Sequence, residues 1–256
     1  PLIVGAVYGL GPHWTFLAIA GLDTISALTI RNIKLDSPQT NTLERPSLAN
    51  ALGGLRLVRR TPLLLAVIGL DLFAVLLGGV IALAPAISTN LLSAGESAPF
   101  WLRSAGAVGA AVTAVALART PLAANIGKTL LKAVAIFGGL TILVAFSRNL
   151  AITLFLFAAL AAADMVSVFI RATIVPLATP DSLRGRVLAV EAVFIGASNE
   201  LGAFESGITA EWFGLVPAII ISGIATILVV LLFAIFVPDL RKLNHFDEIT
   251  DGMEPI

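Results

Sequence analysis

The sequence has no cysteine, only two histidines and few charged residues, since Asp, Glu, Lys and Arg make up 12% of its 256 residues. The lack of cysteine excludes a disulfide framework and a thiolate metal site. His13 and His245 lie in unrelated segments, which supports neither a histidine metal pair nor a Ser-His-Asp arrangement. Soluble domains carry about 25% charged residues. Half that density cannot cover a globule of this size, which argues against an ordinary cytosolic enzyme.

Positive charge is not in excess either, because 16 basic residues balance 16 acidic ones. A net charge of zero provides no overall field to attract nucleic acid. Gly127-Lys128-Thr129 has the ending of a phosphate-binding loop, but Leu122 stands where that motif needs glycine. The sequence therefore predicts no enzyme activity, no cofactor and no bound metal.

Long apolar runs dominate what is present, with 58% hydrophobic residues and a mean hydropathy of +0.99. A bilayer core needs about 20 apolar residues in a helix, and the run at 63–84 lacks the alternation of a barrel strand. We therefore predict an all-α polytopic membrane protein. Seven runs are long enough to span, at about 13–33, 62–87, 98–118, 130–147, 150–175, 187–210 and 215–238.

The basic residues predict how these runs are oriented. Thirteen of the sixteen lie on one side of an alternating path, whereas the opposite connections contain only Arg148. Basic residues stay on the cytoplasmic side, so we place the C-terminus in the cytoplasm and the protein in an inner membrane. The thirteen are Arg31, Lys34, Arg45, Arg56, Arg59, Arg60, Arg119, Lys128, Lys132, Arg184, Arg186, Arg241 and Lys242.

The polar segment 35–60 divides the chain. Residues 36–46 have a linker composition. Ser47 can cap a helix over 47–60 that lies at the membrane interface, although a flexible basic linker explains the same residues equally well. Because position 1 is proline, we interpret the chain as a fragment of a longer one, and 1–9 as the end of a partial helix. The acidic tail, 241–256, is expected to be cytoplasmic, and residues 244–256 are expected to be poorly ordered.

Ionisable residues within the runs are the candidates for function. Each costs roughly 2.5–3.5 kcal/mol at a helix centre, so such residues usually face a bundle interior or a cavity. Asp164 and Arg171 lie two helical turns apart on one face, about 10 Å by helix rise. A substrate, a water chain or a charge on another helix would bridge them. The full set is Asp23, Asp71, Arg103, Asp164, Arg171, Glu191, Glu200 and Glu205.

The run at 187–210 combines an acidic face with small residues. Glu191, Ser198 and Glu205 repeat every seven residues and form one polar stripe. Ser198, Gly202 and Ser206 repeat every four, a pattern that lets another helix approach closely. The alternative interpretation is that the charges only pair with one another to fix the helix register.

The segment 179–214 is similar to the late helices of the major facilitator superfamily, and nearest to the branch of enterobactin (siderophore) exporters and related multidrug efflux proteins. The resemblance is carried by Pro-Asp-Ser-Leu-Arg-Gly-Arg at 180–186, by Ser-Asn-Glu-Leu-Gly with Phe-Glu-Ser-Gly at 198–207, and by Asp164 and Arg171. It implies that 61–240 is the C-terminal six-helix bundle. Residues 1–34 would then be the end of an N-terminal half, which is otherwise missing and would be the bundle's partner.

The resemblance implies secondary transport by alternating access, with a siderophore or amphiphilic drug as substrate and protons as coupling ion. Asp164, Glu191 and Glu205 would carry protons, with Asp71 and Arg171 in the same pathway. Asp181, Arg184 and Arg186 would lock the cytoplasmic end. The alternative is a truncated or degenerate membrane scaffold that does not transport. ATP-driven transport would require a separate ATPase subunit.

Overall fold

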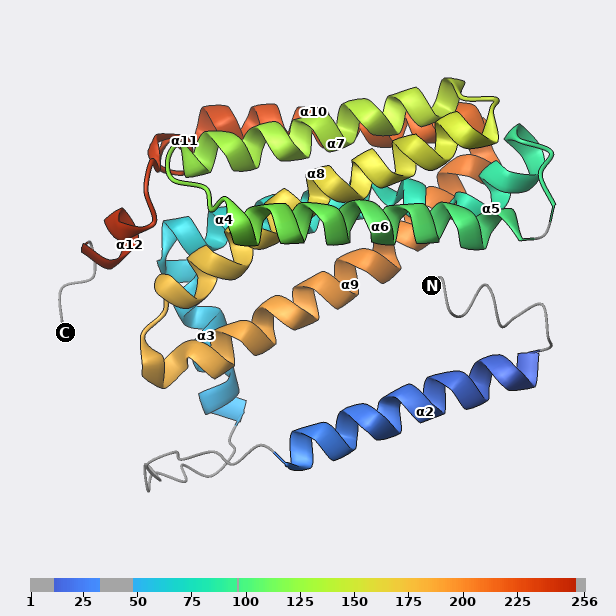
Figure 1. Ribbon diagram of the computed structural model, residues 1–256. Helices are drawn as coiled ribbons and strands as arrows, with labels where there is room; N and C mark the ends of the chain where they lie inside the picture. The colour runs from blue at the N-terminus through green and yellow to red at the C-terminus, as the bar shows by residue number, and fades with distance from the viewer. Residues whose placement is uncertain (1–11, 33–47, 96, 252–256) are drawn as a thin grey trace. The chain divides into compact units, whose positions relative to one another are not determined.

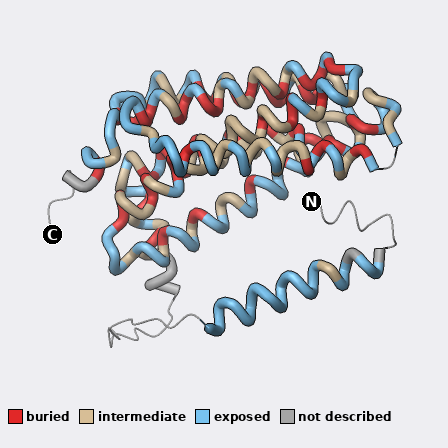
Figure 2. Tube along the Cα trace, in the orientation of Figure 1, coloured by how far each residue is buried: buried red, intermediate tan, exposed pale blue. Residues whose placement is uncertain are grey.

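The computed structural model describes residues 12–32, 48–95 and 97–251. The chain divides into two compact units, 1–47 and 48–256, which are described separately. In the first unit, helix α2 spans Pro12–Arg31, and its described side chains are exposed along nearly its whole length (Figure 2). The expected partial helix at 1–9 and the linker at 36–46 lie outside the described residues.

The second unit consists of helices joined by short connections, with no strand among its described residues (Figure 1). Six helical segments are long and apolar enough to cross a membrane, and they correspond to the last six runs of the sequence. Helix α2 coincides with the first run but is not among the six, so the seventh span stays a prediction. The six are Pro62–Leu91, α6 (Ala98–Arg119), α7 (Ile126–Phe146), α8 (Leu150–Leu177), α9 (Asp181–Phe213) and α10 (Leu215–Phe236).

Two apolar cores hold these helices together. Helix α6 packs mainly on α8, α7 lies between α8 and α10, and α9 packs on α4 (Pro62–Leu77) and α10. One core is centred on Leu64, Leu130 and Ile174, and the other on Ile87, Leu102 and Leu160. All six of these side chains are at most 1% exposed. The packing therefore continues from one end of the bundle to the other.

The first of the six segments is not one continuous helix. Helix α4 ends at Leu77 and is followed by a 3-10 turn at Gly79–Ile81, a short α5 (Ala84–Ala86) and a π-helical turn at Ile87–Leu91. A Cβ atom on Gly79 would run into the Ser206 hydroxyl and lie 2.8 Å from the carbonyl oxygen of Gly202. Only glycine therefore lets the broken segment approach α9 this closely.

The ends of α8 and α9 follow from their local sequences. The Asn149 side chain accepts hydrogen bonds from the backbone N–H groups of Ala151 (2.9 Å) and Ile152 (3.2 Å), which caps α8. Helix α9 begins at Asp181 directly after Pro180, earlier than the expected 187, because an acidic residue suits the first turn of a helix. It ends at Phe213, just before Gly214, whose φ of +89° favours glycine.

The segment after the last span folds onto the bundle, contrary to the expectation of a poorly ordered tail. The backbone N–H groups of Ile126 and Gly127, at the start of α7, donate to the carbonyl groups of Asn244 (3.2 Å) and Leu243 (3.0 Å). Ile249, in the short α12 (Asp247–Asp251), is 6% exposed and belongs to the first apolar core. Burial of apolar side chains outweighs the acidic composition here; residues 252–256 lie outside the described ones.

Candidate functional site

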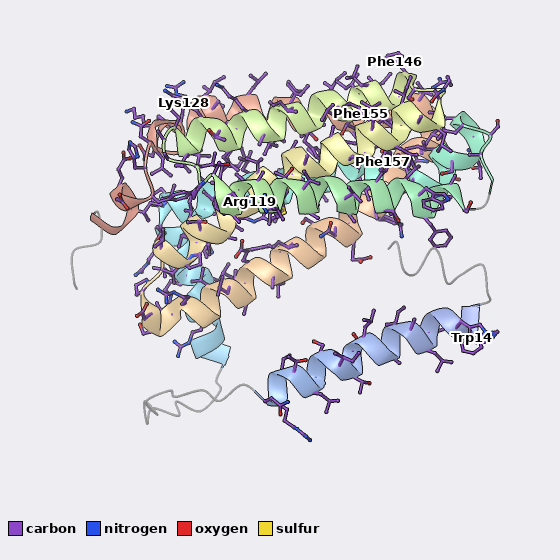
Figure 3. All side chains as sticks on the ribbon, in the orientation of Figure 1. Trp14, Arg119, Lys128, Phe146, Phe155 and Phe157 are labelled. Carbon is purple, nitrogen blue, oxygen red and sulfur yellow. The ribbon has the colours of Figure 1, made fainter. Side chains whose placement is uncertain are left out.

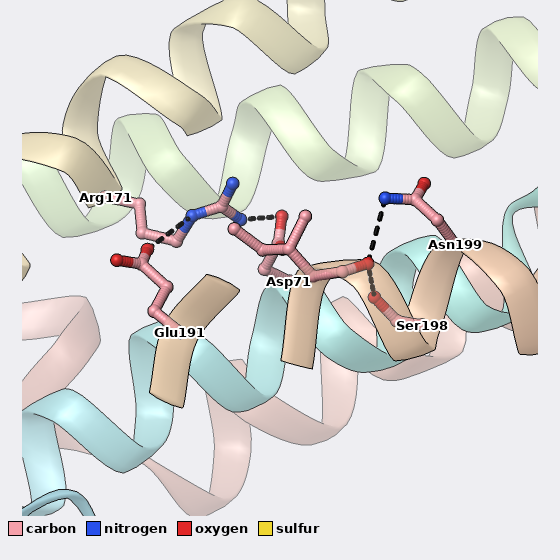
Figure 4. Close-up of polar contacts among 6 residues, drawn as sticks. Asp71, Arg171, Glu191, Ser198 and Asn199 are labelled. Carbon is pink, nitrogen blue, oxygen red and sulfur yellow. Dashed lines mark hydrogen bonds and ion pairs between the residues drawn. The ribbon is translucent and has the colours of Figure 1, made fainter. Parts of the chain in front are cut away.

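Three buried charged residues from three helices meet inside the bundle. The Arg171 guanidinium, on α8, pairs through Nη1 with the Asp71 carboxylate of α4, and through Nε with Glu191 Oε1 of α9 at 3.1 Å (Figure 4). The three residues are only 7%, 6% and 8% exposed, for Asp71, Arg171 and Glu191 respectively. We call them the ion cluster. One cation lies between two anions, so the fully ionised cluster carries a net charge of −1.

The local sequences place these charges in an apolar surrounding. Asp71 follows Leu64, Val67 and Ile68 on the buried stripe of α4. Arg171 follows Ile170 directly, and that isoleucine is fully buried in the core. A charge in such a place is stable only with a partner, and removing one partner leaves the other uncompensated. The three helices therefore depend on one another at this level.

Asp164 is not part of the ion cluster, but it lines a cavity together with one member of the cluster, Asp71. Together with Asp71 and Ser167 it lines a cavity of about 20 Å³, which is room for one water molecule with polar partners. Asp164 forms no ion pair with any described residue. Asp71 pairs with Arg171 and lines the same cavity as Asp164, so the two residues of α8 have a common neighbour on α4.

Asp164 also lines a second cavity, of about 240 Å³. Arg103 of α6 and Asn199 of α9 contribute the other polar groups, and Phe137 and Ile81 contribute apolar surface. The Asn199 amide donates to the carbonyl of Ile195 at 2.9 Å (Figure 4). Arg103 is among the ionisable residues expected within the runs, whereas neither charge nor spacing singles out Asn199. Their helical registers bring both to the cavity that Asp164 lines.

Glu205 is not part of this arrangement. Its carboxylate accepts hydrogen bonds from Thr209 (2.7 Å) and Ser206 (3.5 Å) on its own helix, and it lines neither cavity. The polar stripe therefore separates: Glu191 joins the ion cluster, whereas Glu205 is satisfied locally. Glu200 is exposed on the same helix, and Asp23 is exposed on α2.

The small residues of α9 lie against the broken first segment. Ser198, Gly202 and Ser206 are buried, and a Cβ atom on Gly202 would lie 2.8 Å from the carbonyl oxygen of Val75 and 3.0 Å from that of Leu76. These contacts fix the distance between α9 and α4, and with it the position of Glu191 relative to Asp71.

The three residues expected at the cytoplasmic end lie in the first two turns of α9. Asp181 and Arg184 form an exposed ion pair of 2.5 Å within the helix, and Arg186 contacts α3 (Leu48–Arg60) through its backbone. The structure does not bring these residues to either cavity. Among the described residues, no group of three or more His, Asp or Glu side chains is placed to hold a metal ion.

A comparison with models of protein families identifies the family of the chain. The family described as "transmembrane secretion effector", a family of the major facilitator superfamily, matches residues 1–253. This chain belongs to that family. Its membership of this family and its long apolar helices together identify the chain as a multi-pass membrane protein of the transporter type. No curated protein and no solved structure matches it.

Proposed function

We propose that this protein is a proton-coupled secondary transporter that exports a siderophore or an amphiphilic drug across the bacterial inner membrane by alternating access. The ion cluster of Asp71, Arg171 and Glu191 is the observation that carries the proposal. It ties together three helices that line the cavities, and its charges do not cancel. One added proton brings its net charge from −1 to zero.

A proton on either carboxylate would release one of the two pairs that Arg171 makes. Because Asp71 belongs to α4 and Glu191 to α9, each pair joins α8 to a different helix. Loss of one pair therefore loosens one helix contact while the other is kept. This is the kind of two-state element that alternating access requires, since occupancy by a proton then favours one arrangement of the helices.

Asp164 is the group best placed to exchange protons between the cluster and the substrate. It lines both the cavity of about 240 Å³ and the water-sized cavity that Asp71 also lines. A proton or a cationic group arriving in the larger cavity would therefore meet Asp164 first. Binding of substrate and binding of a proton then depend on the same carboxylate.

The larger cavity suits one part of an amphiphilic molecule. Phe137, Ile81 and Val75 supply apolar surface, and Arg103, Asp164 and Asn199 supply charge and hydrogen bonds. Sites for drug-sized ligands occupy about 300–1,000 Å³, so this cavity of about 240 Å³ would hold a portion of such a molecule.

The proposal is tested with the protein reconstituted into liposomes across which a pH gradient is imposed. Ethidium serves as the amphiphilic drug, and a tris-catecholate as the siderophore. We expect the gradient to drive movement of at least one of them, and a protonophore to abolish it. Asp164→Asn and Arg171→Ala should each lower the rate of gradient-driven transport at least about tenfold, because each removes a group that acts in the coupled step.

Glu211→Gln is the matched control, because Glu211 is an exposed carboxylate at the far end of α9. Its transport rate should equal that of the unmodified protein. Unchanged transport in both Asp164→Asn and Arg171→Ala would remove these residues from the mechanism. Transport that persists with the protonophore would show that protons do not drive it.

A further inference from the structure

Helix α3 has two unlike faces, and the inner one is fixed to the bundle. Val58 is 1% exposed and belongs to the first apolar core. A Cβ atom on Gly54 would lie 2.6 Å from the carbonyl oxygen of Arg186, so the backbone of α3 rests directly on that of α9. The position of the outer face is therefore set by packing rather than by the charged residues themselves.

The outer face carries three arginines and no compensating charge. Arg56, Arg59 and Arg60 follow the spacing i, i+3, i+4, which places them on one side of the helix. All three are exposed, and none forms an ion pair with a described residue. Together with Leu55 they line an open groove. Three unpaired guanidinium groups around one leucine make a site for an anion that also has an apolar part.

This face lies where the first long apolar segment of the bundle begins. Arg60 precedes Pro62, the first residue of α4, by two positions, and two residues extend over at most about 7 Å. Arg56 is one turn earlier, roughly 6 Å by helix rise. If α4 enters the hydrocarbon at Pro62, all three arginines lie at the depth of the lipid headgroups.

We propose that Arg56, Arg59 and Arg60 bind the phosphate headgroup of an anionic phospholipid, with Leu55 against the glycerol and upper acyl region. The planar guanidinium group donates two parallel hydrogen bonds to phosphate oxygens. A basic segment next to a span gains about fivefold in binding per arginine near an anionic leaflet. Because the inner face of α3 rests on α9, the bound lipid also holds α3 in place beside the helix that carries Glu191.

The test uses the full chain in neutral detergent, with phosphatidylglycerol, phosphatidylcholine and inorganic phosphate as separate probes. Binding is measured as lipid retained on the protein by native mass spectrometry. We expect phosphatidylglycerol to be retained in preference to phosphatidylcholine. The triple variant Arg56→Gln, Arg59→Gln, Arg60→Gln should bind phosphatidylglycerol at least about tenfold more weakly. The variant with lysine at the same three positions should keep most of the binding, because it keeps the charge.

A control variant removes the same charge elsewhere on the exposed surface of the bundle, through Arg119→Gln, Lys128→Gln and Lys132→Gln (Figure 3 labels the first two residues). Its affinity for phosphatidylglycerol should fall by less than that of the first triple variant, because none of these three residues lines the groove with Leu55. Equal losses in the two triple variants would overturn the proposal in favour of a nonspecific charge effect. Binding of inorganic phosphate that depends on the three arginines, without any preference for phosphatidylglycerol, would overturn the lipid assignment. Unchanged melting temperatures in both variants exclude unfolding as the cause, and this test requires no transport.

Discussion

Asp164 and Asp71 line the same water-sized cavity although they belong to different helices, α8 and α4. Asp71 is at the same time one of the two partners of Arg171. A water molecule there would have polar partners in both carboxylates and in Ser167. The cavity therefore lies between a carboxylate that borders the larger cavity, Asp164, and the aspartate that pairs with Arg171.

Filling this cavity should separate proton coupling from substrate binding. Ala74 lines it and is 7% exposed, so Ala74→Val adds two methyl groups where the water would lie. We expect gradient-driven transport to fall at least about tenfold, with a loss of stability of about 1–3 kcal/mol from overpacking. Ethidium binding without a gradient should stay within about twofold. Ala74→Ser, which leaves room for water, is the control, and equal transport in the two variants would contradict the prediction.

The ion cluster allows the register interpretation to be tested against the pathway interpretation. Arg171→Gln leaves two buried carboxylates without their cation, and breaking a buried pair costs about 3–5 kcal/mol. The melting temperature in detergent should fall accordingly. The triple variant Asp71→Asn, Arg171→Gln, Glu191→Gln removes every charge and should recover most of that stability. If the triple variant also transports normally, the cluster serves the register alone; we expect it to be stable and inactive.

The packing of α9 against α4 should tolerate no added methyl group at Gly202. A Cβ atom there would lie 2.8 Å from the carbonyl oxygen of Val75, whereas a Cβ atom on Gly196, six residues earlier on the same helix, would meet nothing within 4 Å. We expect Gly202→Ala to destabilise the protein by about 1–3 kcal/mol. Gly196→Ala should stabilise it slightly, by up to about 1 kcal/mol, because alanine favours helix. Equal melting temperatures for the two variants would show that the close contact does not limit stability.

Much of the fold could be predicted because lipid imposes strict requirements on sequence. Runs of about 20 apolar residues must be helical, and six of the seven runs correspond to long helices. The interruption after Leu77 was harder to predict. Glycine and proline, which stand here at Gly78, Gly79 and Pro85, are also common in continuous membrane helices. It depends on the contact between Gly79 and α9, which no local pattern encodes.

The candidate site could be predicted only in part, for a similar reason. Spacing on α8 identified Asp164 and Arg171, and the cost of a charge in lipid identified Asp71 and Glu191. Which carboxylate meets the arginine depends on how α4 and α9 rotate against α8, and periodicity within one helix does not determine that rotation. Arg103 lies near the start of α6, and its position along that one helix says nothing about the cavity that it lines.

Arg103 should decide between the two classes of substrate. It is the one basic residue among those lining the larger cavity and forms no ion pair with a described residue. A hydrogen bond to a charged group contributes about 1.5–3 kcal/mol. Arg103→Gln should therefore weaken binding of the anionic tris-catecholate at least about tenfold. Binding of the cation ethidium should be unchanged or tighter, since a positive charge in the cavity that Asp164 lines has been removed.

Arg148→Gln is the control, because Arg148 donates to the carbonyl of Ala145 outside the cavity. Equal effects of Arg103→Gln on both ligands would show that Arg103 does not contact the substrate.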